Sequence, residues 1–151
     1  MRRILIVDDQ PYLCELFPHE LMGENCHITC ASDRESVKRC LEGATPDVVF
    51  LEISLHGFEG WEVLRDIKTA NPHVPVLIVT SYDNYPNDPR TSEADGYMLK
   101  DFIHLELLKE KITRALAVRE QRKPPYPIKH ALPLSASGSI SRNIMLQESM
   151  P

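Results

Sequence analysis

Long apolar runs are missing from this 151-residue sequence, and their absence argues against a membrane-spanning helix. No apolar stretch approaches the roughly 18 residues that such a helix needs. The opening segment, MRRILIVDD, has only four consecutive apolar residues before two aspartates, which is too few for a secretory signal peptide. We therefore expect a cytoplasmic protein with no membrane partner.

The sequence also lacks an excess of basic residues and any cysteine pattern typical of a metal site. The net charge is −5, and a globular body of this sign offers no electrostatic footprint for nucleic acid. The four cysteines (Cys14, Cys26, Cys30 and Cys40) match no zinc-ligand spacing. We expect them to be reduced and mostly buried, because free cysteine behaves as a small hydrophobic residue.

The chain is long enough for one domain with a substantial core. Beyond about residue 122 the composition changes to KPPYPIKHALPLSASGSISRNIMLQESMP, which is rich in proline and serine and is typical of a linker or tail. We predict a domain over residues 1–120 and a Pro/Ser-rich C-terminal tail over residues 121–151.

Short apolar runs alternate with segments whose apolar residues recur at helical spacing. The runs, each of which predicts a strand, cover residues 2–9, 27–31, 47–51, 74–81 and 96–100. The helical patterns cover residues 11–22, 32–41, 61–71 and 104–121. The central strands are continuously apolar, which is typical of a parallel sheet covered on both faces. We predict an α/β fold, a five-stranded parallel sheet with helices on both faces.

Two local features refine this prediction. Ser32 and Glu35 have the S-x-x-E spacing of a capping box and are predicted to begin the second helix. Between the fourth and fifth strands, SYDNYPNDPRTSEAD contains Pro86 and Pro89 and has no apolar face. We therefore expect the fourth helix to be short or irregular, with residues 82–92 forming at most a single turn.

Polar residues stand at or just beyond the carboxyl ends of four strands, where parallel sheets bind their ligands. They are Asp8, Asp9, Glu52, Thr80, Ser81 and Lys100. Converging carboxylates repel each other and require a cation or a raised pKa, and Mg²⁺ prefers such oxygen ligands. A hydroxyl and an ammonium group beside them suit a phosphoryl group. The constellation therefore indicates a metal-assisted phosphoryl site.

Five segments, in this order and spacing, resemble the receiver domain of two-component response regulators over about residues 1–120. They are ILIVDD, ASDRESVKRCLEG, PDVVFLEISLHGFEGWEVLRDIK, VPVLIVTS and ADGYMLKDF. The resemblance implies a flavodoxin-like sheet that carries an acid pair for Mg²⁺, a phosphoacceptor aspartate, a switch hydroxyl with its aromatic partner, and a phosphate-binding lysine. Asp8 and Asp9 match the acid pair, and Glu52 matches the phosphoacceptor. Thr80 matches the switch hydroxyl, Tyr97 its aromatic partner, and Lys100 the phosphate-binding lysine. Ser54 matches the position whose backbone carbonyl completes the metal shell.

Glu52 departs from this family, because the phosphoacceptor is expected to be aspartate. One extra methylene displaces the attacking oxygen by roughly a bond length, and errors near 1 Å cost about 10²-fold in rate. We therefore do not expect Glu52 to accept phosphate. His56 also departs from the family, since it replaces the proline usual in the turn after the acceptor.

We expect a single-domain, receiver-like signalling protein of a two-component phosphorelay that is a phosphorylation-independent pseudo-receiver and not an enzyme. Its partner would be a histidine kinase or a downstream signalling protein, and Mg²⁺ binding would be weak or lost. Glu52 either supplies the charge of a phosphoryl group or is inert. Two alternatives remain open: an active response regulator phosphorylated at Glu52 with Mg²⁺, and a flavodoxin-like binder of a small ligand. The lack of a glycine-rich loop after the first strand argues against the binder.

Overall fold

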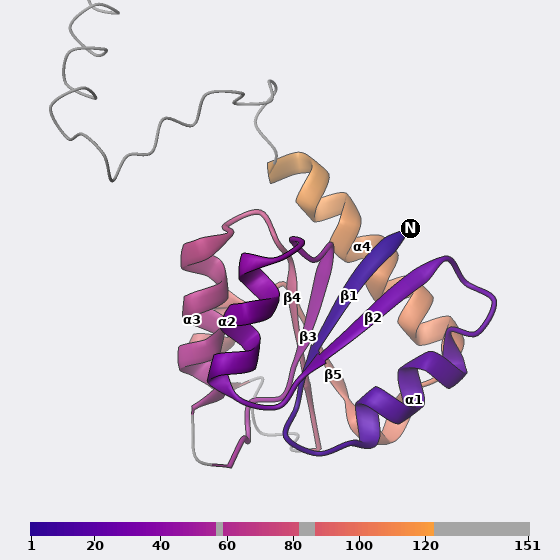
Figure 1. Cartoon of the computed structure of the whole chain (residues 1–151), viewed down its shortest axis with the longest axis horizontal. Helices are drawn as coiled ribbons and strands as arrows, with labels where there is room; N and C mark the ends of the chain where they lie inside the picture. Colours follow the sequence, from indigo (N-terminus) through magenta and orange to yellow (C-terminus); the bar gives the residue numbers. More distant parts are fainter. Residues whose placement is uncertain (57–58, 82–86, 123–151) are drawn as a thin grey trace, which may run out of the picture.

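The computed structural model describes residues 1–56, 59–81 and 87–122, which form one five-stranded parallel sheet with helices packed on it (Figure 1). The strand order across the sheet is β2-β1-β3-β4-β5, so β2 and β5 are the edges. The strands are β1 (Arg2–Val7), β2 (Cys26–Ala31), β3 (Val48–Leu51), β4 (Val76–Thr80) and β5 (Gly96–Leu99).

The helices form a layer on each face of the sheet (Figure 1). They are α1 (Tyr12–Glu20), α2 (Arg34–Glu42), α3 (Gly60–Ala70) and α4 (Leu105–Arg122). α1 and α4 pack on one face, where Phe17 meets Phe50 edge to face with ring centroids 4.8 Å apart. α2 and α3 cover the other face through side chains such as Val37 and Leu64. Every residue of β3 and β4 is buried, as expected for a sheet enclosed by two helical layers.

The predicted fold class is confirmed: a five-stranded parallel sheet with helices on both faces. Within the described part of the connection before the last strand, a short 3₁₀-helix, η2 (Pro89–Glu93), takes the place of a regular helix. Pro89 can occupy its first turn because the missing amide would have no partner there. Residues 82–86, the remainder of the predicted irregular segment, lie outside the described residues.

The predicted capping box is wrong by one residue. Asp33, not Ser32, caps α2: its carboxylate accepts a hydrogen bond from the amide of Ser36 at 2.7 Å. The Ser36 hydroxyl lies 3.1 Å from the Asp33 amide and accepts its hydrogen bond, which closes the box. Aspartate is as good an N-cap residue as serine, and here a serine hydroxyl accepts the hydrogen bond that a glutamate carboxylate accepts in the usual box.

The prediction that all four cysteines are reduced is also wrong for one pair. Cys14 and Cys30 form a disulfide whose Cα atoms are 6.2 Å apart, whereas Cys26 and Cys40 are free thiols. α1 lies along the edge strand β2, so the first turn of the helix meets the end of the strand (Figure 1). Cysteine spacing along the chain gives no sign of this approach.

No helix in residues 1–56, 59–81 or 87–122 has both the length and the apolar character needed to cross a membrane. α4 ends at Arg122, and the predicted tail lies outside the described residues from position 123 onward.

Candidate functional site

Four polar side chains are brought together because their strands end at the same edge of the sheet. Asp8 follows β1, Glu52 follows β3, Thr80 is the last residue of β4, and Lys100 follows β5. All four residues are buried, with exposed fractions between 0% for Thr80 and 8% for Lys100. The parallel pairing of β1, β3, β4 and β5 fixes this convergence.

Lys100 lies between two carboxylates. Its Nζ donates a hydrogen bond to Oδ2 of Asp8 at 2.7 Å and lies 3.0 Å from Oε1 of Glu52. Burial alone would lower the pKa of Lys100, but the hydrogen bonds and charges of Asp8 and Glu52 outweigh burial and raise it above its usual value. The lysine is therefore a permanent cation at neutral pH.

The second carboxylate oxygen of Glu52 is bound by backbone amides of the loop that follows β3. Oε2 accepts a hydrogen bond from the amide of Ile53 at 2.8 Å and a longer one from the amide of Ser54 at 3.4 Å. Both oxygens of Glu52 thus have protein partners, one cationic and the other a pair of backbone donors. An acyl phosphate would have to form on an oxygen already held by one of these groups.

Gly60 holds this loop against the start of α3. A Cβ atom at Gly60 would lie 2.5 Å from the Cα of Ile53 and 2.9 Å from the carbonyl oxygen of Glu52, closer than any side chain tolerates. Only glycine allows this approach. Sequence reasoning did not single out Gly60, because glycine is common where a helix begins and gives no sign of a distant segment packing on it.

Asp9 has a different partner from Asp8. Its Oδ2 accepts a hydrogen bond from the backbone amide of His56 at 2.6 Å and contacts the His56 ring Nδ1 at 2.5 Å. Burial raises the pKa of Asp9, but these bonds and the histidine charge outweigh it and lower the pKa below its usual value. Oδ1 of Asp9 is buried and has no hydrogen-bond partner within the described residues.

Thr80 and Tyr97 lie on the two strands farthest from β2. Thr80 is fully buried and pairs in register with Leu99, the residue before Lys100. Tyr97 pairs with Ile78 and packs, half-buried, against the core under α2 and α3. Both therefore lie on strands that end beside the carboxylates.

The carboxylates do not form a magnesium site as they are arranged. Among the described residues, no group of three or more His, Cys, Asp or Glu side chains is placed to hold a metal ion. Lys100 engages Asp8 and Glu52, and His56 engages Asp9, which leaves Oδ1 of Asp9 without a partner in the described part of the chain. The residues present thus do not fit Mg²⁺ without rearrangement.

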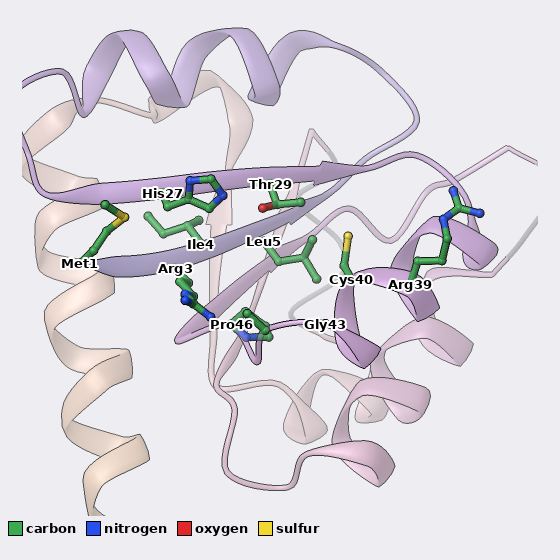
Figure 2. A pocket seen from close by; sticks show the side chains of 11 residues that line it. Met1, Arg3, Ile4, Leu5, His27, Thr29, Arg39, Cys40, Gly43 and Pro46 are labelled. Atoms are coloured by element: carbon green, nitrogen blue, oxygen red, sulfur yellow. The ribbon is translucent and has the colours of Figure 1, made fainter.

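A separate hollow of about 400 Å³ lies far from these residues, near the amino end of β1. Figure 2 shows its lining, which includes Arg3, Leu5, His27 and Cys40. None of the predicted site residues lines it. Ligands of open parallel sheets bind at the carboxyl edge, so this hollow gives no support to the flavodoxin-like binder.

A parallel sheet in this strand order, with a buried lysine between carboxylates at its carboxyl edge, defines a flavodoxin-like receiver fold. The sequence matches the response regulator receiver domain family over residues 4–113, and the chain belongs to that family. It is therefore the receiver domain of a two-component response regulator.

Relatives support the same assignment. The chain is 35% identical over 101 residues to the "Probable transcriptional regulatory protein TcrX" of Mycobacterium tuberculosis, a match that covers 66% of this chain and 43% of that protein. It is 33% identical to the transcriptional regulatory protein TrcR of the same organism, over 70% of this chain and 42% of TrcR. The chain thus spans less than half the length of these curated relatives.

Among solved structures, the response regulator TrrA of Thermotoga maritima is similar at a TM-score of 0.69 and 34% identity. The match covers 77% of this chain and all of TrrA, which was solved in complex with Mg²⁺ and BeF. TrrA was also solved in complex with the histidine kinase ThkA, and that structure matches at a TM-score of 0.67. A CheY-like receiver from Methanospirillum hungatei matches at a TM-score of 0.72 and 26% identity.

Proposed function

We propose that this chain is a pseudo-receiver, which signals by binding a partner protein without being phosphorylated at Glu52. One observation carries the proposal: the ammonium group of Lys100 lies 3.0 Å from a carboxylate that the chain itself supplies. In the family that the chain resembles, this lysine binds the phosphoryl group. Here Glu52 provides a negative charge in reach of the lysine without any modification.

The backbone contacts of Glu52 support the same interpretation. Hydrogen bonds from Ile53 and Ser54 hold Oε2, so the carboxylate has a defined position instead of a range of rotamers. A buried carboxylate with ionic and backbone partners is costly to move, because each partner would be left unsatisfied. We infer that Glu52 fixes the site in one state.

The metal-site assignments belong to this proposal as well. We assign Asp8, Asp9, Glu52 and the backbone carbonyl of Ser54 to a degenerate magnesium site whose affinity is weak or lost. Thr80, Tyr97 and Lys100 are assigned to the remnant of the switch. The contacts of Lys100 and His56 with the three carboxylates support this view, because a metal would have to displace them.

We further propose that residues 1–120 act as a non-enzymatic binding module in the cytoplasm and that residues 121–151 are a tail. The complex of TrrA with ThkA supports a histidine kinase as one kind of partner. A downstream signalling protein is the other. The acidic composition of the chain supports a protein partner over nucleic acid.

Beryllofluoride tests this proposal, since it mimics a phosphoryl group on an acceptor carboxylate and was captured with Mg²⁺ on TrrA. In ¹⁵N NMR spectra of the full chain, we expect Mg²⁺ and beryllofluoride to leave the amides of Glu52, Thr80 and Lys100 unshifted. The E52Q variant should shift these amides in the absence of both additions, because it removes the charge beside Lys100. Saturable shifts of the parent chain at the three amides would instead favour an active response regulator.

A further inference from the structure

The disulfide between Cys14 and Cys30 joins the two chain segments that flank the acid pair. Cys14 lies in the first turn of α1, directly after the segment that carries Asp8 and Asp9. Cys30 lies one residue before Ala31, the last residue of β2, whose carbonyl accepts a hydrogen bond from the amide of Asp8 at 3.0 Å. The disulfide thus ties the start of α1 to the end of β2, next to the acid pair of the candidate site.

The two residues of this pair differ in exposure. Cys30 is an exposed residue of the edge strand β2, whereas Cys14, in α1, is half-buried. Their Cα separation of 6.2 Å lies within the range that a disulfide spans without moving the backbone. A small thiolate can approach a disulfide through an exposed residue, and exposed disulfides are among the labile ones.

The other two cysteines do not compete for this pairing. Cys26 lies on β2 four residues before Cys30, which places the two about 13 Å apart along the strand. Cys40 packs against the core on the opposite face of the sheet. Both are half-buried, and burial raises the pKa of each thiol, which makes them less reactive than an exposed cysteine.

We propose that Cys14 and Cys30 are a reversible redox pair, oxidised by a small organic disulfide of the glutathione type, and that its state sets how firmly residues 8–14 are held against β2. The proposal is independent of whether Glu52 accepts phosphate. The redox control rests on the cytoplasmic location proposed above. Disulfides in reducing compartments are mostly transient or redox-sensing, so a receiver domain with such a pair is open to control by the thiol pool.

The exchange proceeds in two balanced steps. The thiolate of Cys30 attacks one sulfur of the small disulfide, forms a mixed disulfide and releases one small thiolate. The thiolate of Cys14 then attacks the sulfur of Cys30, forms the protein disulfide and releases the second small thiolate. The protein loses two electrons to the small disulfide, and its two thiol protons end on the two released thiols. Reduction is the reverse, beginning with attack of a small thiolate on the sulfur of Cys30, the exposed residue of the pair.

The pairing is tested with the C26S/C40S variant of the full chain, which retains only the proposed pair. After equilibration in buffers of varied reduced and oxidised glutathione, free thiols are blocked with N-ethylmaleimide and counted by intact mass. We expect two species, with no label or two labels, whose ratio follows the buffer. The matched C14S/C30S variant should keep both labels, on Cys26 and Cys40, throughout.

The effect on the site is tested on the parent chain, so that it depends on no variant. Hydrogen–deuterium exchange of residues 8–14 and 26–31 should be several-fold slower in the oxidised than in the reduced protein, with little change in α3. Two results would overturn the proposal. One is a C26S/C40S variant that stays fully labelled or forms only glutathione adducts; the other is equal exchange of the two segments in both redox states.

Discussion

The side chain of Glu52 reaches two kinds of donor at once. One oxygen lies 3.0 Å from the ammonium of Lys100, and the other accepts hydrogen bonds from the amides of Ile53 and Ser54. The position is fixed by the end of β3 and by Gly60, which lets α3 press on this loop. The side chain of Glu52 therefore supplies charge to the site, and its loop is packed tightly against α3.

Lys100 is the residue on which the charge balance of the site depends. K100M keeps most of the side-chain volume but leaves Asp8 and Glu52 as buried carboxylates without a cation. We expect this variant to lose about 3 kcal/mol of unfolding free energy, as happens when one partner of a buried ion pair is removed. Urea unfolding measures the loss.

The control for K100M is K109M, which breaks the exposed pair of Lys109 with Glu24. Exposed ion pairs contribute little, so K109M should unfold at nearly the same urea concentration as the parent. Equal midpoints for K100M and K109M would show that Lys100 does not hold the two carboxylates together.

Most of the candidate site could be predicted because it depends on strand ends. Asp8, Glu52, Thr80 and Lys100 follow or close apolar runs, and parallel strands bring such positions to one edge. The contact of His56 with Asp9 could not be predicted, because it depends on the path of the loop after β3, which no periodic pattern encodes.

Among the single elements, α2 shows that the residue that caps the start of a helix can be hard to identify from the sequence. Asp33 caps the helix and Ser32 precedes it, although both residue types are good N-caps. We expect D33A to lower Tm by about 3 °C, since it removes the acceptor for the Ser36 amide. S32A should leave Tm nearly unchanged, as measured by thermal unfolding of both variants. A larger loss for S32A would restore the sequence-based assignment.

An aspartate whose side chain is buried connects three elements at the end of the sheet away from the site. Asp95, just before β5, accepts hydrogen bonds from Lys68 of α3 at 2.5 Å and from the amide of Val76, and it pairs with Arg122 at the end of α4. Burial raises the pKa of Asp95, but the bonds from Arg122 and Lys68 outweigh it and hold the pKa below its usual value.

The lowered pKa makes the stability that Asp95 contributes depend on pH. A carboxylate whose pKa is depressed on folding stabilises the protein fully above its unfolded pKa, near 4, and loses this contribution as the pH falls through the folded value. We expect D95N to be about 2 kcal/mol less stable than the parent at pH 6, with the gap closing below about pH 4. Urea unfolding across this pH range measures the gap.

The control for D95N is D101N, which alters an exposed aspartate of η3 (Lys100–Phe102). The difference in unfolding free energy between D101N and the parent should stay constant over the same pH range. A constant gap between D95N and the parent at every pH would mean that the carboxylate charge of Asp95 does not stabilise the fold.

For the whole molecule, the sheet and its two helical layers were predictable because continuous apolar runs require burial on both faces. The pairing of Cys14 with Cys30 was not, since it depends on how α1 lies along the edge strand. The prolines indicated that no regular helix would precede β5, and within the described residues the short 3₁₀-helix η2 lies there.

The whole molecule also combines a receiver fold with a changed acceptor. Family membership and the similarity to TrrA establish the fold and its signalling class. We propose that the identity of residue 52 decides whether the receiver takes up phosphate or holds its own charge beside Lys100.

The most direct test of this claim compares the parent chain with E52D after incubation with acetyl phosphate and Mg²⁺. Aspartate retracts the carboxylate by one methylene and places an acceptor of the length that the family uses after β3. Intact mass should show one added phosphate on E52D and none on the parent. Phosphate on Glu52 of the parent, located by peptide mass, would contradict a phosphorylation-independent receiver, and an E52D variant without phosphate would show that side-chain length is not the barrier.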